Sequence, residues 1–263
     1  MPDDSTTWFP DDYGVDPIRA ARAASAATPL PRRFYKEAGV AETDGGFVLV
    51  LDGRPARTPA KSPLALPSRG AGEAVAAEWA AQGQDINPAS MPLTRLVNTG
   101  LDGVARMREE VIDEIAKYAG TDLLCYRAGD PARLVQRQSD AWDPVLDWAR
   151  DEIGARFFLA EGVMFAEQPA SSLAAVRGAV AEVIDPIALA ALSTMTSLTG
   201  SVLLALAVSR GRLSASEAWA AAHVDEDFQM EVWGADDEAL ERRARRWNEM
   251  EASATLFRLL HAP

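Results

Sequence analysis

The sequence has very little cysteine and histidine, which limits the metal and redox chemistry open to it. Cys125 is the only cysteine in 263 residues, and His223 and His261 are the only histidines. A single cysteine excludes both an intrachain disulfide and a metal cluster held by several thiolates. Because Cys125 lies in the apolar run Leu123–Tyr126, we interpret it as a buried structural thiol; a nucleophile would need a neighbouring base and an electropositive setting.

Positive charge is also scarce. The chain has 26 Lys and Arg against 39 Asp and Glu, a formal charge of −13, which repels phosphate backbones and anionic lipid surfaces. We therefore expect no nucleic-acid partner. No glycine-rich phosphate loop, internal repeat or heptad array is present. A hydrophobic content of 48% is enough for a substantial core.

One uncharged stretch, residues 187–208, is long enough to cross a bilayer. Six Ser and Thr residues and Gly200 dilute its apolar character, and Asp185 with Pro186 marks a helix start just before it. We expect a buried helix, or two short helices that meet near Gly200, and a protein that is not embedded in a membrane.

Residues 1–30 are predicted to form a flexible, acidic and alanine-rich arm. They lack the basic start and apolar run of a secretory signal, and their acidic residues argue against a transit peptide. The arm either forms a loose helix or stays disordered. Export is not indicated.

Residues 31–90 carry a β pattern. Asp52-Gly53 follows an apolar run and predicts a hairpin over Phe47–Thr58. The segment Arg33–Ala38 is expected to pair with the other side of this hairpin. A helix over Gly72–Gln82 would cover the sheet and end at the following glycine. The result is a small β-rich N-terminal domain of two layers.

Residues 91–263 are predicted to form a larger, mainly helical domain, which makes the fold class α+β. Thr94 or Asn98 is expected to cap its first helix. The expected helical segments are Val104–Tyr118, Trp142–Ala149, Ser172–Ile184, the uncharged stretch, Ser214–Val232 and Asp236–Leu260, with short strands at Leu123–Arg127 and Phe157–Ala160.

The stretch from 223 to 234 has the highest density of chemically active side chains. On a helix, His223, Glu226 and Asp227 fall on one side, at spacings suited to a cation. A metal-assisted hydrolase, or another small-molecule enzyme centred on these three residues, is therefore one candidate. The sequence has no second Glu-x-x-His pair, and adjacent carboxylates point about 100° apart. We expect no catalytic residue, metal or cofactor.

Protein recognition is the other interpretation of this stretch. Acidic side chains beside Phe228 and Trp233 would form a charged rim around apolar anchors, although Trp233 fits a core position equally well, and several of the charges could simply be a solvated face. The candidate partner-binding residues are Glu226, Asp227, Phe228, Glu231 and Trp233.

Several segments in this order resemble a known family: the assembly chaperones that bind the alpha subunit of the catalytic head of F-type ATP synthase in mitochondria and alphaproteobacteria. The matching segments are Arg33–Lys36, Leu51–Lys61, Met91–Leu96, Tyr118–Tyr126, Trp142–Pro144, Thr199–Ser201 and His223–Gly234. Each is weak alone, and their shared order and spacing make the combination specific.

The resemblance implies an α+β chaperone that is not an enzyme. Such a protein holds the unassembled alpha subunit and masks its subunit interface until the beta subunit replaces it. The family's functional acidic positions match Glu226 and Glu231, which diverge by about 140° on an ideal helix, so that one contacts the partner while the other supports the local fold. We expect a free monomer in the bacterial cytoplasm, with eukaryotic relatives in the mitochondrial matrix.

Overall fold

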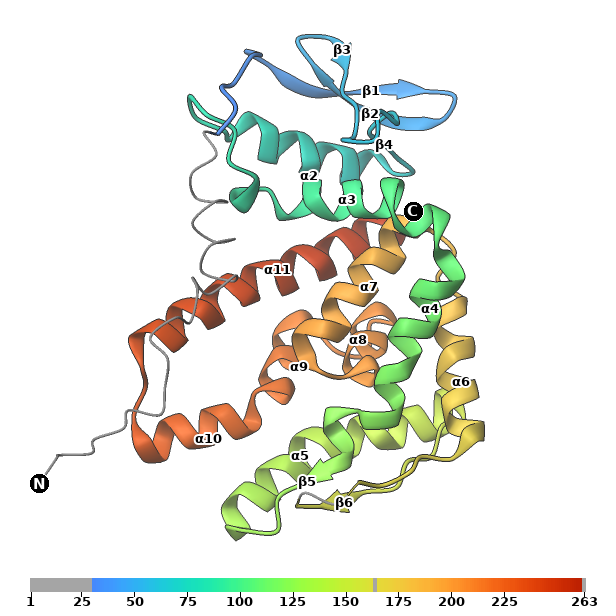
Figure 1. Ribbon diagram of the computed structural model, residues 1–263, viewed down its shortest axis with the longest axis vertical. Coiled ribbons are helices and arrows are strands. Elements are labelled where there is room, and N and C mark those ends of the chain that lie inside the picture. Colours follow the sequence, from blue (N-terminus) through green and yellow to red (C-terminus); the bar gives the residue numbers. More distant parts are fainter. Residues whose placement is uncertain (1–29, 163–164, 262–263) are drawn as a thin grey trace, which may run out of the picture. The chain divides into compact units, whose positions relative to one another are not determined.

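The computed structural model describes residues 30–162 and 165–261, so that the predicted arm lies outside the described residues except for Leu30. A small antiparallel sheet near the N-terminus is followed by helices over most of the remaining chain (Figure 1). The predicted α+β class is confirmed.

Residues 30–34 and 82–87 form a small unit of their own. An antiparallel bridge joins Arg32 and Asp85. The Arg33 N–H donates to the Gln84 carbonyl oxygen at 2.8 Å, and the Ile86 N–H donates to the Pro31 carbonyl oxygen at 2.8 Å. The remaining described residues belong to a second, larger unit.

The sheet of the larger unit consists of β1 (Ala38–Thr43), β2 (Gly46–Leu51), β3 (Arg54–Pro55) and β4 (Ala65–Leu66), with β2 paired to the other three. The predicted hairpin is confirmed: Leu51 pairs with Arg54, and Asp52 and Gly53 have φ of 48° and 75°, both in the left-handed region that such a two-residue turn requires.

The strand predicted over Arg33–Ala38 is wrong, because β1 begins only at Ala38. The Lys36 and Glu37 N–H groups donate to one carboxylate oxygen of Asp52, at 3.0 and 2.9 Å. The Asp52 N–H in turn donates to the Glu37 carbonyl oxygen at 2.9 Å, so the backbone just before β1 is bonded to the turn that follows β2.

Helix α2 (Arg69–Ala80) covers the sheet as expected (Figure 1). It begins three residues before the predicted Gly72, because Ser68 caps it by accepting from the Ala71 N–H at 3.2 Å. It also ends before Gly83, at Ala80. A Cβ on Gly72 would lie 3.2 Å from Val40 of β1, so this glycine lets the helix lie close to the strand.

The next helix, α3 (Pro92–Asp102), follows the short 3₁₀ helix η1 (Pro88–Ser90). Its N-terminus is capped by Glu78 of α2, whose carboxylate accepts from the Leu93 and Thr94 N–H groups at 2.7 and 2.8 Å. The prediction of Thr94 or Asn98 as the cap is therefore wrong. Burial raises the pKa of Glu78, against the lowering effect of these donors.

The rest of the larger unit is mainly helical. Its elements are η2 (Val104–Arg106), α4 (Arg108–Lys117), η3 (Tyr118–Thr121), η4 (Leu123–Cys125), β5 (Tyr126–Arg127), α5 (Ala132–Trp148), the π-helical turn η5 (Ala149–Ile153), β6 (Ala160–Glu161), α6 (Ala170–Ala181), α7 (Pro186–Thr199), α8 (Val202–Ser209), α9 (Ala215–Ala222), α10 (Val224–Trp233) and α11 (Asp237–His261). The helix predicted over Val104–Tyr118 is interrupted at Met107, whose side chain is exposed. The strands predicted over Leu123–Arg127 and Phe157–Ala160 are confirmed only at their ends, where β5 and β6 pair in parallel. Leu123–Cys125 is the 3₁₀ helix η4 and residues 157–159 are not in a strand.

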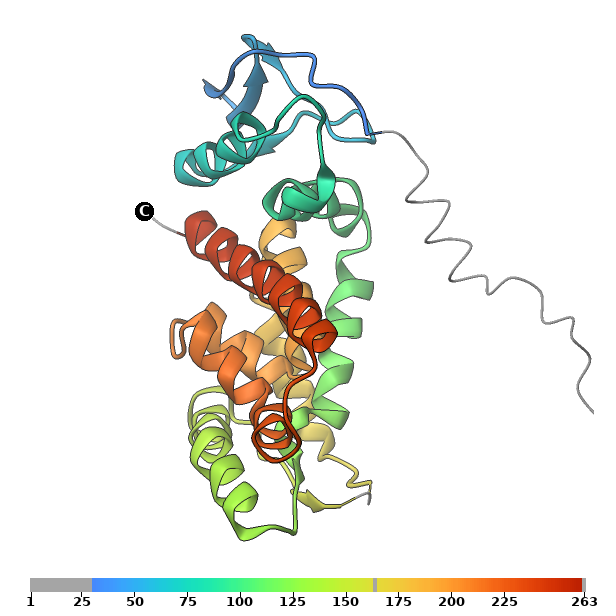
Figure 2. The ribbon, with the colours of Figure 1, turned by 90° about the vertical axis from the view of Figure 1, so that its left-hand side faces the viewer.

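The core lies around α7 and α8, in which most residues are buried. Gly200 separates them with a φ of 67°, which confirms two helices that meet there. The long helix α11 packs against α7 and α3 (Figures 1 and 2). Across the described ranges, no helix has both the length and the apolar character needed to cross a membrane.

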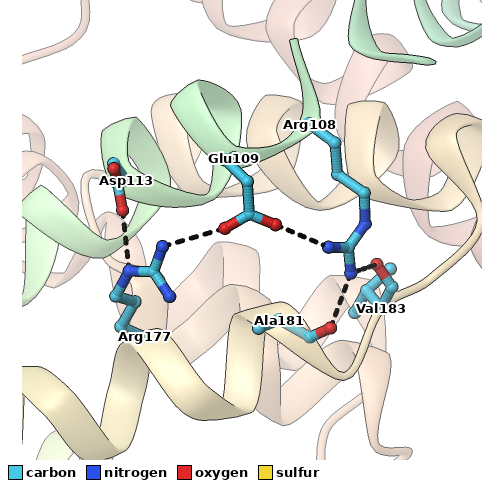
Figure 3. A network of polar contacts seen from close by, with 6 residues as sticks. All are labelled: Arg108, Glu109, Asp113, Arg177, Ala181 and Val183. Carbon is cyan, nitrogen blue, oxygen red and sulfur yellow. Dashed lines mark hydrogen bonds and ion pairs between the residues drawn. The ribbon is translucent and has the colours of Figure 1, made fainter. Parts of the chain in front are cut away.

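Helices α4 and α6 are joined by charged side chains. Glu109 contacts Arg108 and Arg177 at 3.0 Å each, and Arg177 also reaches Asp113 at 2.7 Å (Figure 3). Arg108 also donates to the carbonyl oxygens of Ala181, at 2.7 Å, and Val183, at 3.2 Å. It thereby satisfies acceptors that the end of α6 leaves open.

Cys125 is buried, in agreement with its interpretation as a structural thiol. Burial is the main cause that raises its pKa to about 12, and the nearby Asp122 carboxylate adds to the rise. The thiol is therefore neutral near pH 7 and is a poor nucleophile.

Candidate partner-binding site

The helix predicted over Ser214–Val232 is divided at His223, which ends α9 and precedes α10. The His223 side chain is buried at 3% exposure. Its Nδ1 lies 2.7 Å from the Trp219 carbonyl oxygen, so Nδ1 carries the proton and donates. Burial lowers the pKa of His223. The ring is therefore neutral near pH 7 and presents an unprotonated Nε2 towards Glu226, 3.8 Å away.

Polar contacts hold α10 in place. None of its ten residues, all of them described, is buried. Asp225 accepts from the Gln138 side-chain amide of α5 at 2.7 Å, and Asp227 forms an ion pair with Arg243 of α11. Two of the acidic side chains therefore fasten α10 to its neighbours and do not face solvent freely.

Glu231 makes the most extensive of these contacts. Both carboxylate oxygens accept from the Arg137 guanidinium at 2.8 Å, and Arg133 donates to one of them at 2.7 Å. These arginines hold the pKa of Glu231 below its usual value, chiefly through the Arg137 hydrogen bonds. The guanidinium carbons of Arg133 and Arg137 also lie 5.9 and 5.6 Å, respectively, from the centre of the Phe228 ring, a cation–π distance. Phe228 and Glu231 thus hold α10 on α5.

Glu226 and Trp233 differ from the other candidate residues because they face outwards. The Glu226 side chain is 57% exposed, and Trp233 is 85% exposed, so a core position for Trp233 is wrong. Both line a pocket of about 330 Å³ between α10 and α11. A large aromatic ring left in solvent, in a pocket that is also lined by a carboxylate, is typical of a protein-binding surface.

The arrangement does not favour a metal centre on His223, Glu226 and Asp227. His223 Nδ1 donates to a backbone carbonyl and Asp227 pairs with an arginine, so the three side chains do not share a ligand position. Across residues 30–162 and 165–261, no group of three or more His, Cys, Asp or Glu side chains could hold a metal ion.

Three arginines of this site were not identified from the sequence. Arg133 and Arg137 lie 98 and 94 positions before Glu231, and periodicity within a helix carries no information about partners so distant. Arg243 is different, because four arginines within residues 242–246 are unusual in so acidic a chain and could have been noticed.

Glu231→Gln is expected to loosen α10 without unfolding the protein, because the neutral amide weakens two charged contacts to α5. Amide hydrogen exchange across 224–233 should become faster in this variant. Glu226→Gln is the matched control on the same helix and should leave the exchange rates unchanged. Equal protection in all three proteins would contradict a fastening role for Glu231.

Comparisons with known proteins agree with this architecture. Residues 32–150 match the family model described as ATP12 chaperone protein. A candidate chaperone from Agrobacterium tumefaciens shares 51% identity, with 94% of this chain and 92% of that chain covered and a TM-score of 0.85. Atp12 from Paracoccus denitrificans shares 41% identity over 88% of this chain and 99% of its own, with a TM-score of 0.82.

A mitochondrial relative, protein atp12 of Schizosaccharomyces pombe, is 21% identical over 235 residues, which cover 83% of this chain and 80% of that protein. Fold and sequence together place the chain among chaperones. It belongs to the ATP12 chaperone family, which confirms the resemblance to ATP synthase assembly chaperones.

Proposed function

We propose that this protein binds the unassembled alpha subunit of the ATP synthase catalytic head and masks its subunit interface until the beta subunit replaces it. Family membership supplies the chaperone class. The observation that supports α10 as the docking element is Trp233, an aromatic side chain 85% exposed on a helix that polar contacts hold in place.

The physical purpose of masking is to prevent aggregation. A subunit that waits for its partner exposes an apolar interface, and such surfaces associate non-specifically. The chaperone offers an exposed aromatic anchor at Trp233 and the Glu226 carboxylate in the lining of the same pocket, a combination of apolar contact and charge that gives both affinity and orientation.

Glu231, Asp227 and Phe228 contribute to this binding surface indirectly. Their contacts with Arg137, Arg243 and the α5 guanidinium groups are intramolecular. We therefore assign partner contact to Glu226 and Trp233, and positioning of α10 to the other three. This division fits the expectation that Glu226 and Glu231 have different roles.

The family also favours a noncatalytic role, and no observation at the site favours the alternative hydrolase. We further propose that the free chain is monomeric and acts in the cytoplasm of a bacterium. Relatives in Paracoccus denitrificans and in mitochondria of Schizosaccharomyces pombe support action where an ATP synthase head is assembled.

Glu226→Lys is expected to weaken the complex with purified alpha subunit roughly tenfold or more, because an attraction becomes a repulsion at the edge of the pocket. Titration calorimetry measures the affinity, and circular dichroism should stay unchanged because the side chain is exposed. The wild-type chain should also co-purify with unassembled alpha subunit at low salt.

Glu114→Lys is a suitable control for this charge reversal. Glu114 is exposed on α4 and pairs with Lys117, a contact that contributes little, so the variant should bind like wild type. An unfolded Glu226→Lys variant would make Glu226 a structural residue, and wild-type affinity in a folded one would remove α10 from the interface. Failure of the wild-type chain to bind alpha subunit would contradict the proposed function itself.

A further inference from the structure

The pocket between α10 and α11 has both an apolar part and charged side chains in its lining. Helix α10 ends at Trp233, and after a short connection through Gly234 the chain returns along α11, with Asp227 opposite Arg243. Met230, Trp233 and Ala239 give the pocket an apolar part. Its charged lining consists of Glu226, Asp236, Arg242, Arg243 and Arg246.

All three arginines have partners inside the chain, and two of them are held firmly. Arg243 forms the ion pair with Asp227. Arg246 donates to the Leu198 carbonyl oxygen at 2.7 Å and lies 6.0 Å from the Trp219 ring centre. These contacts fix the guanidinium groups, and the charge of Arg246 is not neutralised by the carbonyl that it contacts.

Arg242 is held much more weakly. Its guanidinium lies 3.5 Å from Glu238, one turn earlier on the same helix, and the two side chains are 57% and 82% exposed. Exposed pairs of this kind contribute little to stability. Arg242 can therefore exchange Glu238 for a carboxylate of a bound partner at little cost in free energy. Its planar guanidinium group suits bidentate hydrogen bonding to a carboxylate.

We propose that this pocket binds a partner segment in which an apolar side chain is accompanied by a carboxylate, with the apolar group against Met230 and Trp233 and the carboxylate on Arg242. The proposal rests on the proposed function, because the segment belongs to the alpha subunit. It names the chemistry that the pocket recognises.

Charge complementarity supports this occupant. The chain as a whole has a formal charge of −13, whereas the pocket lining has three guanidinium groups against the two carboxylates of Glu226 and Asp236. Asp227 neutralises Arg243, so Arg242 and Arg246 are the cations available to an acidic side chain. An acidic side chain is therefore stabilised in the pocket and disfavoured elsewhere. Glu226 is negatively charged and would repel a carboxylate placed next to it. The positive charge of Arg242 and the negative charge of Glu226 together determine the direction in which the bound segment lies.

The test measures the affinity of purified alpha subunit for the full-length chain and its variants by titration calorimetry. Arg242→Glu is expected to weaken binding on the order of tenfold or more, and Trp233→Ala by a similar factor. Arg242→Lys keeps the charge and should recover part of the loss. Arg258→Glu, the same charge reversal further along α11, should bind within about twofold of wild type.

Salt dependence gives a second readout. The advantage of wild type over Arg242→Glu should shrink as salt is raised, because an exposed charge pair is screened. Wild-type affinity in a folded Arg242→Glu variant, or equal losses with Arg258→Glu, would overturn the carboxylate contact. If Glu226→Lys still weakened binding in that case, the proposed function would stand without this inference. No binding by wild type would refute both.

Discussion

Replacing Gly100 with alanine is expected to destabilise the protein by about 3 kcal/mol. Gly100 lies in α3 where that helix contacts α7, and a Cβ there would lie 2.6 Å from the Ile187 Cα and 2.9 Å from its Cγ1. Both distances are too short for a carbon–carbon contact, and the Ile187 Cα belongs to the backbone and cannot rotate away. The two helices would have to separate, with loss of packing between them.

Gly178→Ala provides a matched control for this substitution. Gly178 is exposed within α6, and its added Cβ would meet nothing within 4 Å. Alanine should therefore stabilise this helix by roughly 0.5–1 kcal/mol through its better helix propensity. Urea unfolding measures both free energies. If both variants lost equal stability, or if Gly100→Ala were neutral, the close approach of α3 to α7 would be contradicted.

Asp122→Asn is expected to change how stability depends on pH. The Asp122 carboxylate is fully buried and accepts from the Leu124 N–H at 3.1 Å and the Leu203 N–H at 3.2 Å. These donors favour the charged form, but burial is the larger effect and raises the pKa of Asp122 to about 6. The folded state thus holds this proton more tightly than the unfolded state.

The sign of the effect follows from proton linkage. Between about pH 4 and pH 6 the folded state binds more protons at this site, so the contribution of Asp122 to stability falls as pH rises. The loss is complete near pH 7 and amounts to roughly 3 kcal/mol, because a tenfold change in proton affinity corresponds to about 1.4 kcal/mol. Asparagine does not titrate, and the variant lacks this loss.

The measurement compares the free energy of unfolding of wild type and Asp122→Asn at pH 4 and pH 7. The variant should gain about 2.5 kcal/mol relative to wild type over this range, because part of the full effect already lies below pH 4. This change does not depend on the intrinsic cost of the amide. Asp151→Asn should change little between pH 4 and pH 7, because hydrogen bonds from Arg150 hold the pKa of Asp151 below its usual value and its opposite trend therefore lies mainly below pH 4. A constant difference for Asp122→Asn would contradict the burial effect.

Local chemistry made several elements predictable. Asp52-Gly53 requires positive φ at both residues and so identified the hairpin. The uncharged stretch between Asp185 and Gly200 indicated buried helices, because an apolar surface all around a helix must be covered. The first strand was misplaced because Asp52 reaches back to the Lys36 N–H, and no pattern within residues 33–38 shows such a contact.

In the candidate site, too, the sequence predicted some features and not others. Helical spacing indicated that Glu226 and Glu231 face different directions, and the two do have different surroundings: one faces the pocket and the other faces Arg137. Spacing alone did not say which residue has which role. It also did not show that Trp233 is exposed, because an aromatic residue at a helix end suits a core and a binding surface equally well.

The sequence alone determined that this is an acidic α+β chaperone without disulfide or thiolate cluster chemistry, since charge, cysteine number and the order of family segments are properties of the chain itself. The tertiary structure decided which residues of α10 are available to a partner. The available residues are those that do not pair with Arg137 or Arg243. Arg137 lies on α5, far from α10 in the sequence, and Arg243 lies on α11. Ion pairs between separate helices form only when packing brings the helices together, so sequence periodicity cannot show them.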